Sequence, residues 1–383
     1  MRLNKLGIII LCFGLLLLPN SIAHGFSINA RAAILMDPIS GRVLYAQNEH
    51  QRLPPASVTK VMTMLLILEA VHQGRIKWDE TITTSAKAYE MGGSQVFLKE
   101  GEEFPLREMF KAIAVVSAND ASAAVAEHLY GSVDDFVEAM NQRAKKLGLK
   151  DTHFDNETGL PDPAHYSSTY DLAVISRELL KYPEILKFTS IWLDSFRNGK
   201  FVLRNTNELI RLYRGADGLK TGHTDEAKFC LSATAKRGDF RLLSIILGAD
   251  SDDQRVEQSK RILDYGFRNF QWQQIGRPGE VGKIYIKDAR PSHVPVRLKT
   301  EFGTVIARGP EQVIQTRLEV LKNLKLPINA GTKIGTLKAL VNHKEIASVA
   351  VYSMIKVKPA NLIIRWWRAF WELAFNLFKG KKS

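Results

Sequence analysis

The sequence has few of the residues that build disulfides or metal sites. Only two of its 383 residues are cysteine, and its nine histidines include no His-Glu-x-x-His pair. Disulfide frameworks need several cysteines, and zinc sites need clustered cysteine and histidine ligands. The chain also lacks a Gly-x-Ser-x-Gly elbow and a glycine-rich phosphate loop, which are typical of α/β-hydrolases and of nucleotide-binding proteins. These absences predict a protein that needs no metal and no cofactor.

The N-terminus lacks an apolar run long enough to cross a bilayer. Arg2 and Lys5 precede an apolar run over residues 7–18, and the small-residue site Ser21-Ile22-Ala23 follows. A spanning helix needs about 20 apolar residues, so this run is too short for a comfortable anchor. A basic start, a short apolar run and a small-residue site are typical of a secretory signal peptide. Residues 1–23 are therefore predicted to be a signal peptide of an exported protein, with an uncleaved anchor as the alternative.

Acidic residues are outnumbered by basic ones. The 53 Lys and Arg exceed the 40 Asp and Glu, which gives a net charge of +13. This surplus predicts an anionic partner such as a lipid surface, a wall polymer or nucleic acid. Because the signal peptide directs the chain out of the cytoplasm, a lipid or wall partner is expected and nucleic acid is not.

The C-terminal segment, residues 359–383, has the pattern of a helix with two unlike faces. Polar residues recur at steps of three or four along one face, which is formed by Arg365, Arg368, Glu372, Asn376 and Lys379. The other face is wide, apolar and rich in aromatic residues, a pattern typical of a helix that lies in a membrane interface. The segment is predicted to bind an anionic membrane surface. The alternatives are a helix docked on the protein's own core and a dimer helix.

Helical and strand-like segments are mixed in the first two thirds of the chain. The apolar periodicity predicts a helix from residue 57, single helices over 106–131 and 133–148, and a helix over 253–270. It also predicts a hairpin over 32–48 and extended segments over 201–249, with a turn at Gly238-Asp239. Antiparallel hairpins without a βα repeat favour an α+β fold. Cys230, in one extended segment, is expected to be a small buried apolar residue.

The composition changes near Gly276. Residues 280–357 form short alternating segments with no long amphipathic helix, which predicts a separate β-rich domain. The predicted division is a main domain over 24–276, a small β-rich domain over 277–358 and the amphipathic terminal helix over 359–383.

The candidate catalytic residues begin with Ser57 and Lys60 in the stretch PASVTK. Pro54 and Pro55 prevent an earlier helix start, so the two side chains are expected one turn apart on one helix face. The helix is apolar on nearly every side, and a lysine buried in it should have a pKa below about 10.4. A neutral amine beside a serine hydroxyl can act as its general base. On this pattern alone, Ser57 as a helix N-cap with Lys60 pointing to solvent is the favoured alternative.

Two further motifs favour the catalytic interpretation. Ser353-Met354-Ile355-Lys356 shows that Ser-x-x-Lys is weak evidence by itself, because it lies in a strand-like segment where residues three apart face opposite sides. However, Ser117-Ala118-Asn119 and Lys220-Thr221-Gly222 follow Ser57 and Lys60 along the chain. Ser-x-x-Lys, Ser-x-Asn and Lys-Thr-Gly in this order form the signature set of penicillin-binding proteins and serine β-lactamases.

The chain resembles the serine D-alanyl-D-alanine carboxypeptidases, a family of low-molecular-mass penicillin-binding proteins. The resemblance runs nearly end to end, through PASVTK, SAND, THF, HYSS, YDLA and DGLKTGHT to the β-rich domain and the tail. It implies a penicillin-binding-protein and β-lactamase-like transpeptidase fold, with an antiparallel sheet flanked by helices. The implied activity is removal of the terminal D-alanine from peptidoglycan stem pentapeptides ending in D-Ala-D-Ala. The second domain and the tail would stand the catalytic domain on the outer face of the cytoplasmic membrane.

The resemblance also implies a role for each candidate site residue. Ser57 would be the nucleophile, Lys60 the base that takes its proton, and Ser117 the group that passes a proton to the leaving D-alanine. The backbone N–H groups of Ser57 and His223 would form the oxyanion hole. The implied substrate-binding residues are Asn119 for the peptide amide, Lys220, Thr221 and Arg255 for the terminal carboxylate, and Gly222 and His223 beside them.

The loop DNETGLPDPAHYSS separates this chain from class A β-lactamases. It has no Glu-x-x-x-Asn pattern of the kind that supplies their deacylation base, and the spacing of Glu157 to any asparagine is wrong. Slow release of bound penicillin and inhibition by β-lactams are therefore expected. The alternatives are a serine β-lactamase, a DD-endopeptidase and a catalytically silent wall-binding protein.

Overall fold

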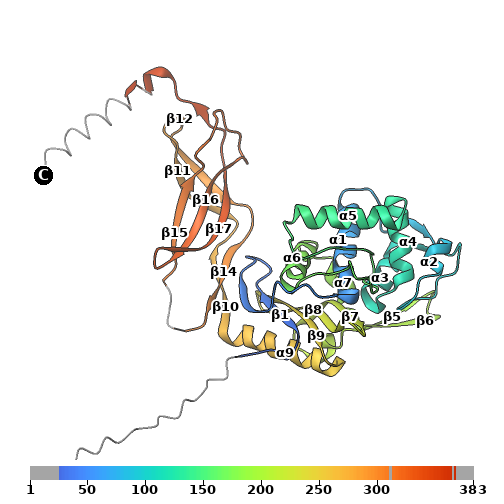
Figure 1. The fold of residues 1–383 in the computed structure, drawn as a ribbon. Coiled ribbons are helices and arrows are strands. Elements are labelled where there is room, and N and C mark those ends of the chain that lie inside the picture. The colour runs from blue at the N-terminus through green and yellow to red at the C-terminus, as the bar shows by residue number, and fades with distance from the viewer. Residues whose placement is uncertain (1–25, 310–312, 365, 368–383) are drawn as a thin grey trace, which may run out of the picture.

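The structure, a computed structural model, describes residues 26–309, 313–364 and 366–367. Figure 1 shows a main part of mixed helices and strands with an elongated β-rich part to one side. The predicted α+β fold with a β-rich C-terminal domain is confirmed. The predicted signal peptide and most of the predicted terminal helix lie outside the described residues.

A five-stranded antiparallel sheet forms the centre of the main part. Its strand order is β2 (Val43–Gln47), β1 (Ala32–Met36), β9 (Phe240–Ala249), β8 (Lys228–Arg237) and β7 (Ala216–Thr224), so β7 is an edge strand. Alternate side chains of β1 enter different cores, with Ile34 on one face of the sheet and Leu35 on the other. Such burial on both faces explains why the inner strands are apolar throughout. The predicted hairpin over 32–48 and the turn at Gly238-Asp239 are confirmed.

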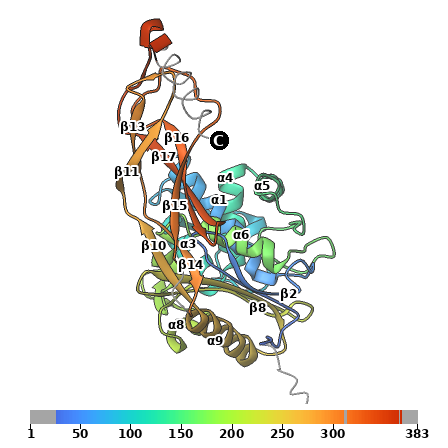
Figure 2. The same cartoon turned by 90° about the vertical axis from the view of Figure 1, so that its left-hand side faces the viewer.

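Helices cover both faces of this sheet. Figure 2 shows α9 (Asp252–Asn269) below the sheet and most other helices above it. The side chain of Ser251 caps α9 by accepting the backbone N–H of Gln254 at 3.1 Å, and this helix confirms the prediction over 253–270. The other helices of the main part are α1 (Lys60–His72), α2 (Ala86–Tyr89), α3 (Leu106–Val116), α4 (Asn119–Tyr130), α5 (Val133–Lys146), α6 (Thr169–Leu179), α7 (Ile185–Thr189) and α8 (Leu209–Leu212).

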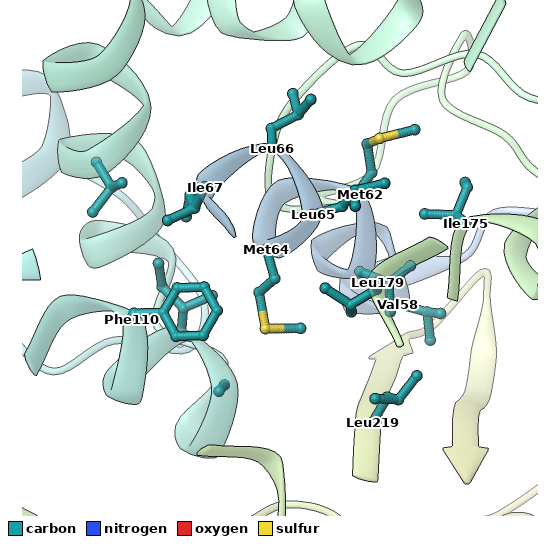
Figure 3. Close-up of a cluster of buried hydrophobic side chains, with 14 of the residues drawn as sticks. Val58, Met62, Met64, Leu65, Leu66, Ile67, Phe110, Ile175, Leu179 and Leu219 are labelled. Atoms are coloured by element: carbon teal, nitrogen blue, oxygen red, sulfur yellow. The ribbon is translucent and has the colours of Figure 1, made fainter. Parts of the chain in front are cut away.

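Helix α1 runs through the middle of the upper layer and is buried on nearly every side, as predicted. Figure 3 shows its apolar side chains pointing in several directions, toward Phe110 of α3, Ile175 and Leu179 of α6, and Leu219 of β7. Each fully buried leucine or methionine contributes about 1.5–3 kcal/mol relative to exposure. The N-terminal end of α1 is therefore held in place by the core around the rest of the helix.

The single helix predicted over 106–131 is wrong, because the chain breaks it into α3 and α4. Ser117 has a left-handed backbone conformation with φ of 64°, and Ala118 is not helical. The break lets the backbone N–H of Asn119 donate to the carbonyl of Ser94 at 2.7 Å. The uniformly extended stretch predicted over 201–249 is also interrupted, by the short helix α8.

Two small hairpin sheets complete the main part. One pairs β3 (Thr81–Thr83) with β4 (Glu103–Pro105), and the other pairs β5 (Leu193–Phe196) with β6 (Phe201–Arg204). Figure 1 shows β5 and β6 at the end of the main part that lies farthest from the β-rich part.

The β-rich part has its own apolar core. Its main sheet has the strand order β11 (Gly279–Tyr285), β13 (His293–Leu298), β17 (Lys344–Ser353), β16 (Lys333–Val341) and β15 (Gln315–Val320). Two further pairs are β10 (Phe270–Gly276) with β14 (Phe302–Ala307), and β12 (Ala289–Arg290) with β18 (Lys358–Pro359). Arg42 joins the two parts by donating from Nη1 to the carbonyl of Val305 at 2.6 Å.

The described part of the tail is strongly exposed. Trp366 and Trp367 have 72% and 61% of their surface accessible, and Leu362 and Ile363 have 80% and 75%. Within the described ranges, no helix has the length and apolar character needed to cross a membrane. The predicted helix beyond residue 367 lies outside these ranges.

Candidate active site

A cleft of about 440 Å³ opens where β7 meets the start of α1 and the break between α3 and α4. Six of the nine predicted site residues line it: Ser57, Ser117, Thr221, Gly222, His223 and Arg255. The other three, Lys60, Asn119 and Lys220, are buried, with at most 3% of their surface exposed. Lys60 and Lys220 donate hydrogen bonds to Ser57 and Thr221 of the first group, and Asn119 accepts one from Lys60. The cleft lining itself extends from Ser57 to Arg255, almost 200 positions apart in the chain.

Ser57 lies in a short 3-10 helix, η1 (Ala56–Thr59), which leads directly into α1. Its side chain makes no capping hydrogen bond, so the alternative of Ser57 as an N-cap is wrong. In a 3-10 helix, side chains three residues apart lie directly above each other. This geometry places Lys60 Nζ 3.1 Å from Ser57 Oγ, and the alternative of Lys60 pointing to solvent is also wrong.

Lys60 sits in a fully buried hydrogen-bond network. Besides Ser57, its Nζ donates to Asn119 Oδ1 at 2.6 Å and to the carbonyl of Thr158 at 2.8 Å. Burial lowers the pKa of Lys60 to about 7, against the opposing effect of nearby acids, chiefly Glu157. An amine with such a pKa is neutral in a large fraction of molecules near pH 7, so it can accept a proton from Ser57.

Ser117 ends α3 in the left-handed conformation and turns its side chain into the cleft. Its Oγ is buried and has no hydrogen-bond partner among the described residues. Buried hydroxyl groups are normally paired, and exceptions mark sites that await a ligand or have a catalytic role. The strained backbone at Ser117 places this unpaired hydroxyl on the wall that adjoins Ser57.

Asn119 is the first residue of α4 and uses both ends of its side-chain amide. Its Oδ1 accepts from Lys60, and its Nδ2 donates to the carbonyl of Gly92 at 2.7 Å. These contacts fasten the start of α4 to the amine of Lys60 and to the loop that contains Ser94, which also lines the cleft.

The opposite wall of the cleft is β7. Lys220 Nζ donates to the carbonyl of Thr221 at 2.9 Å, and burial, with the positive charges of Lys60 and Arg255, holds the pKa of Lys220 well below its usual value. The hydroxyl of Thr221 lies 2.5 Å from that of Thr206. The wall therefore presents a hydroxyl pair to the cleft, with the lysine directly beneath it.

Gly222 lets β7 pass very close to η1, the turn that contains Ser57. A Cβ atom at this position would lie 2.8 Å from the carbonyl oxygen of Pro55 and 2.9 Å from the backbone nitrogens of Ser57 and Val58. All three are backbone atoms and cannot rotate away. Glycine at the third position of Lys-Thr-Gly is therefore a steric requirement of this site.

Arg255 supports β7 from beneath. Its Nη1 donates to the carbonyls of Gly222 at 3.3 Å and Cys230 at 3.4 Å, and its Nη2 pairs with Asp252. Burial lowers the pKa of Arg255. Cys230 is fully buried, and burial raises the pKa of its thiol to about 11, so the prediction of a buried apolar residue is confirmed.

Sequence reasoning considered the loop over 155–160 only for a deacylation base, and it missed that this loop supplies the Thr158 carbonyl to Lys60. Asn156 Oδ1 accepts the backbone N–H groups of Thr158, Gly159 and Leu160 at 3.2, 2.7 and 3.1 Å. A Cβ on Gly159 would lie 1.9 Å from the carbonyl oxygen of Ala56, so the loop packs directly against η1. Asparagine followed three residues later by glycine is the sequence signal for this turn.

Among the described residues, no group of three or more His, Cys, Asp or Glu could hold a metal ion. The cleft holds instead two ion pairs, Arg204 with Glu208 at 3.0 Å and Arg255 with Asp252. Neither Arg204 nor Glu208 was predicted, because isolated charged residues carry no motif.

Comparisons with known proteins match both parts of the chain. The D-alanyl-D-alanine carboxypeptidase family model matches residues 20–251, and the model for the C-terminal domain of penicillin-binding protein 5 matches residues 270–359. D-alanyl-D-alanine carboxypeptidase DacF of Bacillus subtilis is 40% identical over 339 residues, which cover 87% of each chain.

Solved structures show the same architecture. Penicillin-binding protein 5 of Haemophilus influenzae superposes with a TM-score of 0.76 at 33% identity, covering 87% of this chain and 98% of that one. Penicillin-binding protein D2 of Listeria monocytogenes, in its ampicillin-bound form, gives a TM-score of 0.58 at 34% identity, covering 63% and 98%. These similarities confirm the predicted penicillin-binding-protein fold.

Proposed function

The chain belongs to the D-alanyl-D-alanine carboxypeptidase family, and from this premise we propose that Ser57 is its nucleophile and Lys60 the base that activates it. The chain is a serine DD-carboxypeptidase that acts in cell-wall formation. The observation that carries the assignment of residues is the 3.1 Å contact between Lys60 Nζ and Ser57 Oγ, made by a fully buried amine at the floor of the cleft.

In the first half of the proposed reaction, Ser57 is acylated. Its O–H bond breaks, the proton passes to the neutral amine of Lys60, and Oγ bonds to the carbonyl carbon between the two D-alanines. The backbone N–H groups of Ser57 and His223 stabilise the negative oxygen that forms. The close approach of β7 to η1 at Gly222 supports this role, because it brings the two backbones to one point.

Acylation is completed when the peptide bond breaks, and in the second half of the reaction water hydrolyses the ester. The leaving nitrogen takes a proton through the Ser117 hydroxyl, which restores the neutral amine of Lys60 and releases D-alanine. Water then attacks the ester carbonyl, and Ser57 regains its proton as the shortened peptide leaves. Asn119 holds the amide, while Lys220, Thr221, Gly222, His223 and Arg255 form the wall that receives the terminal carboxylate.

The substrate is a peptidoglycan stem peptide, and β-lactams are covalent inhibitors that acylate the same serine. The ampicillin-bound relative supports β-lactam binding in this fold. Glu157 does not line the cleft, which supports the expectation that bound penicillin is released slowly. The rival activities, β-lactamase and DD-endopeptidase, predict rapid penicillin turnover and cleavage of crosslinked dimers.

We further propose that residues 1–23 direct export and that residues 359–383 attach the protein to the outer face of the cytoplasmic membrane. The catalytic domain over 24–276 would then be held off the lipid by the β-rich domain over 277–358. The exposed Leu362, Ile363 and tryptophans at 366–367 support this arrangement, and so does the net charge of +13. Vesicles with anionic lipid should bind the chain 24–383 and not the chain 24–358; equal binding of the two would refute the anchor.

The test of the catalytic assignment uses fluorescent penicillin and a diacyl-Lys-D-Ala-D-Ala peptide. We expect the wild-type protein to become labelled and to release D-alanine, and Ser57→Ala to do neither. Labelling that persists in Ser57→Ala, or wild-type protein that shows neither activity, would refute the assignment. Penicillin turnover within seconds would favour the β-lactamase instead.

A further inference from the structure

Glu157 is a buried acid that the reaction described above does not use. Only 1% of its surface is exposed, and its Oε1 has no hydrogen-bond partner among the described residues. A buried carboxylate oxygen without a partner is costly, and such exceptions call for a functional explanation. It lies outside the lining of the cleft, so it cannot touch the substrate or a water molecule that attacks the ester there.

The backbone around Glu157 is fastened to the first turn of α1. The hydroxyl of Thr63 donates to the carbonyl of Glu157 at 2.6 Å, and Lys60 Nζ donates to the carbonyl of Thr158 at 2.8 Å. Lys60 and Thr63 are three residues apart and share one helix face. Residues 157 and 158 therefore lie along the side of α1 that carries the Lys60 amine. Glu157 directly precedes Thr158, whose carbonyl accepts the hydrogen bond from that amine.

Lys60 needs a compensating negative charge when it becomes protonated. The three acceptors around its Nζ are the neutral oxygens of Ser57, Asn119 and Thr158. An ammonium group in a buried site is stable only if a counter-charge offsets the loss of hydration. Among the described residues, no carboxylate forms a hydrogen bond or ion pair with this nitrogen, so the counter-charge must come from a residue behind these three acceptors.

Two acids act on Lys60 from that layer, Glu157 and, more weakly, Asp120. The carboxylate of Asp120 is occupied by the backbone N–H groups of Val96, Leu98 and Ala121, at 2.9 to 3.2 Å. Glu157 has one unpaired oxygen, and the backbone hydrogen bond that lowers its pKa comes from its own N–H, so backbone dipoles compensate its charge less than that of Asp120. Of these two acids, Glu157 is therefore the one whose negative charge is more available to the amine of Lys60.

We propose that Glu157 is a positioning residue for Lys60: its buried carboxyl group supplies the counter-charge for the ammonium that forms when Lys60 takes the Ser57 proton. No proton is transferred to or from the substrate by Glu157. The proposal rests on the proposed roles of Ser57 and Lys60.

The charged surroundings determine the direction of the effect. Burial raises the pKa of Glu157, and the positive charges of Lys60 and Lys87 oppose that rise. Glu127 of α4 adds to the rise by repulsion. The other ionisable groups that interact with Lys60 are Asp120 on α4, Lys220 on β7 and His165 after the loop. Removing the Glu157 charge should therefore make Lys60 easier to deprotonate and a weaker base.

The test is the pH dependence of acylation by fluorescent penicillin, measured for the wild-type protein, Glu157→Gln and Asp155→Asn. In Glu157→Gln, the acid limb of the rate profile should move down by about one pH unit, the size of shift that a nearby charge produces. The rate on the high-pH plateau should fall, because Lys60 is then a weaker base. Asp155→Asn removes the same charge from an exposed position of the same loop and should leave the profile unchanged.

Each outcome decides the proposal. If the acid limb of the rate profile does not move in Glu157→Gln, the proposal is overturned, whatever happens to the rate at high pH. Glu157 would then only stabilise the loop. If Glu157→Gln does not fold, Glu127→Gln serves instead. Removal of the Glu127 charge favours the ionised form of Glu157, so the acid limb should move to higher pH. An acid limb that does not move overturns the proposal. If fluorescent penicillin does not label the wild-type protein at Ser57, the proposed function itself is refuted, and the test of Glu157 does not arise.

Discussion

The close approach of β7 to η1, the turn that contains Ser57, makes Gly222→Ala a stringent test of the proposed oxyanion hole. The added methyl group would lie 2.8 to 2.9 Å from three backbone atoms of residues 55, 57 and 58. Ordinary carbon contacts begin near 3.5 Å, so β7 and η1 must separate by roughly 0.6 Å, since neither backbone can rotate away. That displacement acts on the N–H of Ser57 and on the neighbouring N–H of His223.

A displacement of this size should cost much more activity than stability. Loss or misplacement of one oxyanion donor slows acyl transfer by about 10²- to 10³-fold. Overpacking of a rigid contact costs about 1–3 kcal/mol of folding free energy, which a domain with this large a core tolerates. We therefore expect a folded Gly222→Ala protein whose acylation by fluorescent penicillin is slower by about 10²-fold.

The matched control is Gly276→Ala in β10. Its added methyl meets the end of the Leu298 side chain at 2.8 Å, and this side chain can rotate away from the contact. Acylation by Gly276→Ala should match the wild type, while thermal unfolding measures the stability of both variants. A Gly222→Ala protein that acylates at the wild-type rate would refute the argument that this contact positions the oxyanion hole.

Two further predictions concern Lys60 and the loop that holds it. Because the pKa of Lys60 is about 7 and the base must be neutral, acylation should rise with pH through 7; about one tenth of the amine is neutral at pH 6. A rate that does not change between pH 5 and 8 would contradict the role of Lys60. Asn156→Ala leaves the three N–H groups of Thr158, Gly159 and Leu160 without their acceptor, and should cost about 1–3 kcal/mol in urea unfolding and slow acylation. Equal stability of Asn156→Ala and the wild type would disprove the loop's dependence on this side chain.

The sequence predicted the parts of the fold that repeat a simple pattern. The hairpin over 32–48, the buried helix α1 and the closing helix α9 follow from periodicity and turn residues alone. The break between α3 and α4 did not, because nothing in the apolar pattern shows that Ser117 adopts a left-handed conformation. That conformation depends on contacts with the loop at Ser94, which is distant in sequence.

The candidate site shows the same division between motif and context. Ser353 and Lys356 share the spacing of Ser57 and Lys60, yet Ser353 Oγ donates to the carbonyl of Ile355 and Lys356 is exposed. The motif residues could be named from their order along the chain. The contact of the Thr158 carbonyl with Lys60 and the burial of Glu157 could not be predicted, because neither a backbone acceptor nor a single buried acid has a sequence signature.

The position of β7 at the edge of its sheet has a consequence for drug resistance. Among the described strands, none pairs with the side of β7 that faces the cleft, and an open strand edge recognises extended peptides through main-chain N–H and C=O groups. A substrate or β-lactam that lies along β7 is then held by atoms that no side-chain substitution removes. A mutation that weakens the main-chain hydrogen bonds to a β-lactam must change the backbone of β7, and the same change weakens binding of the natural peptide.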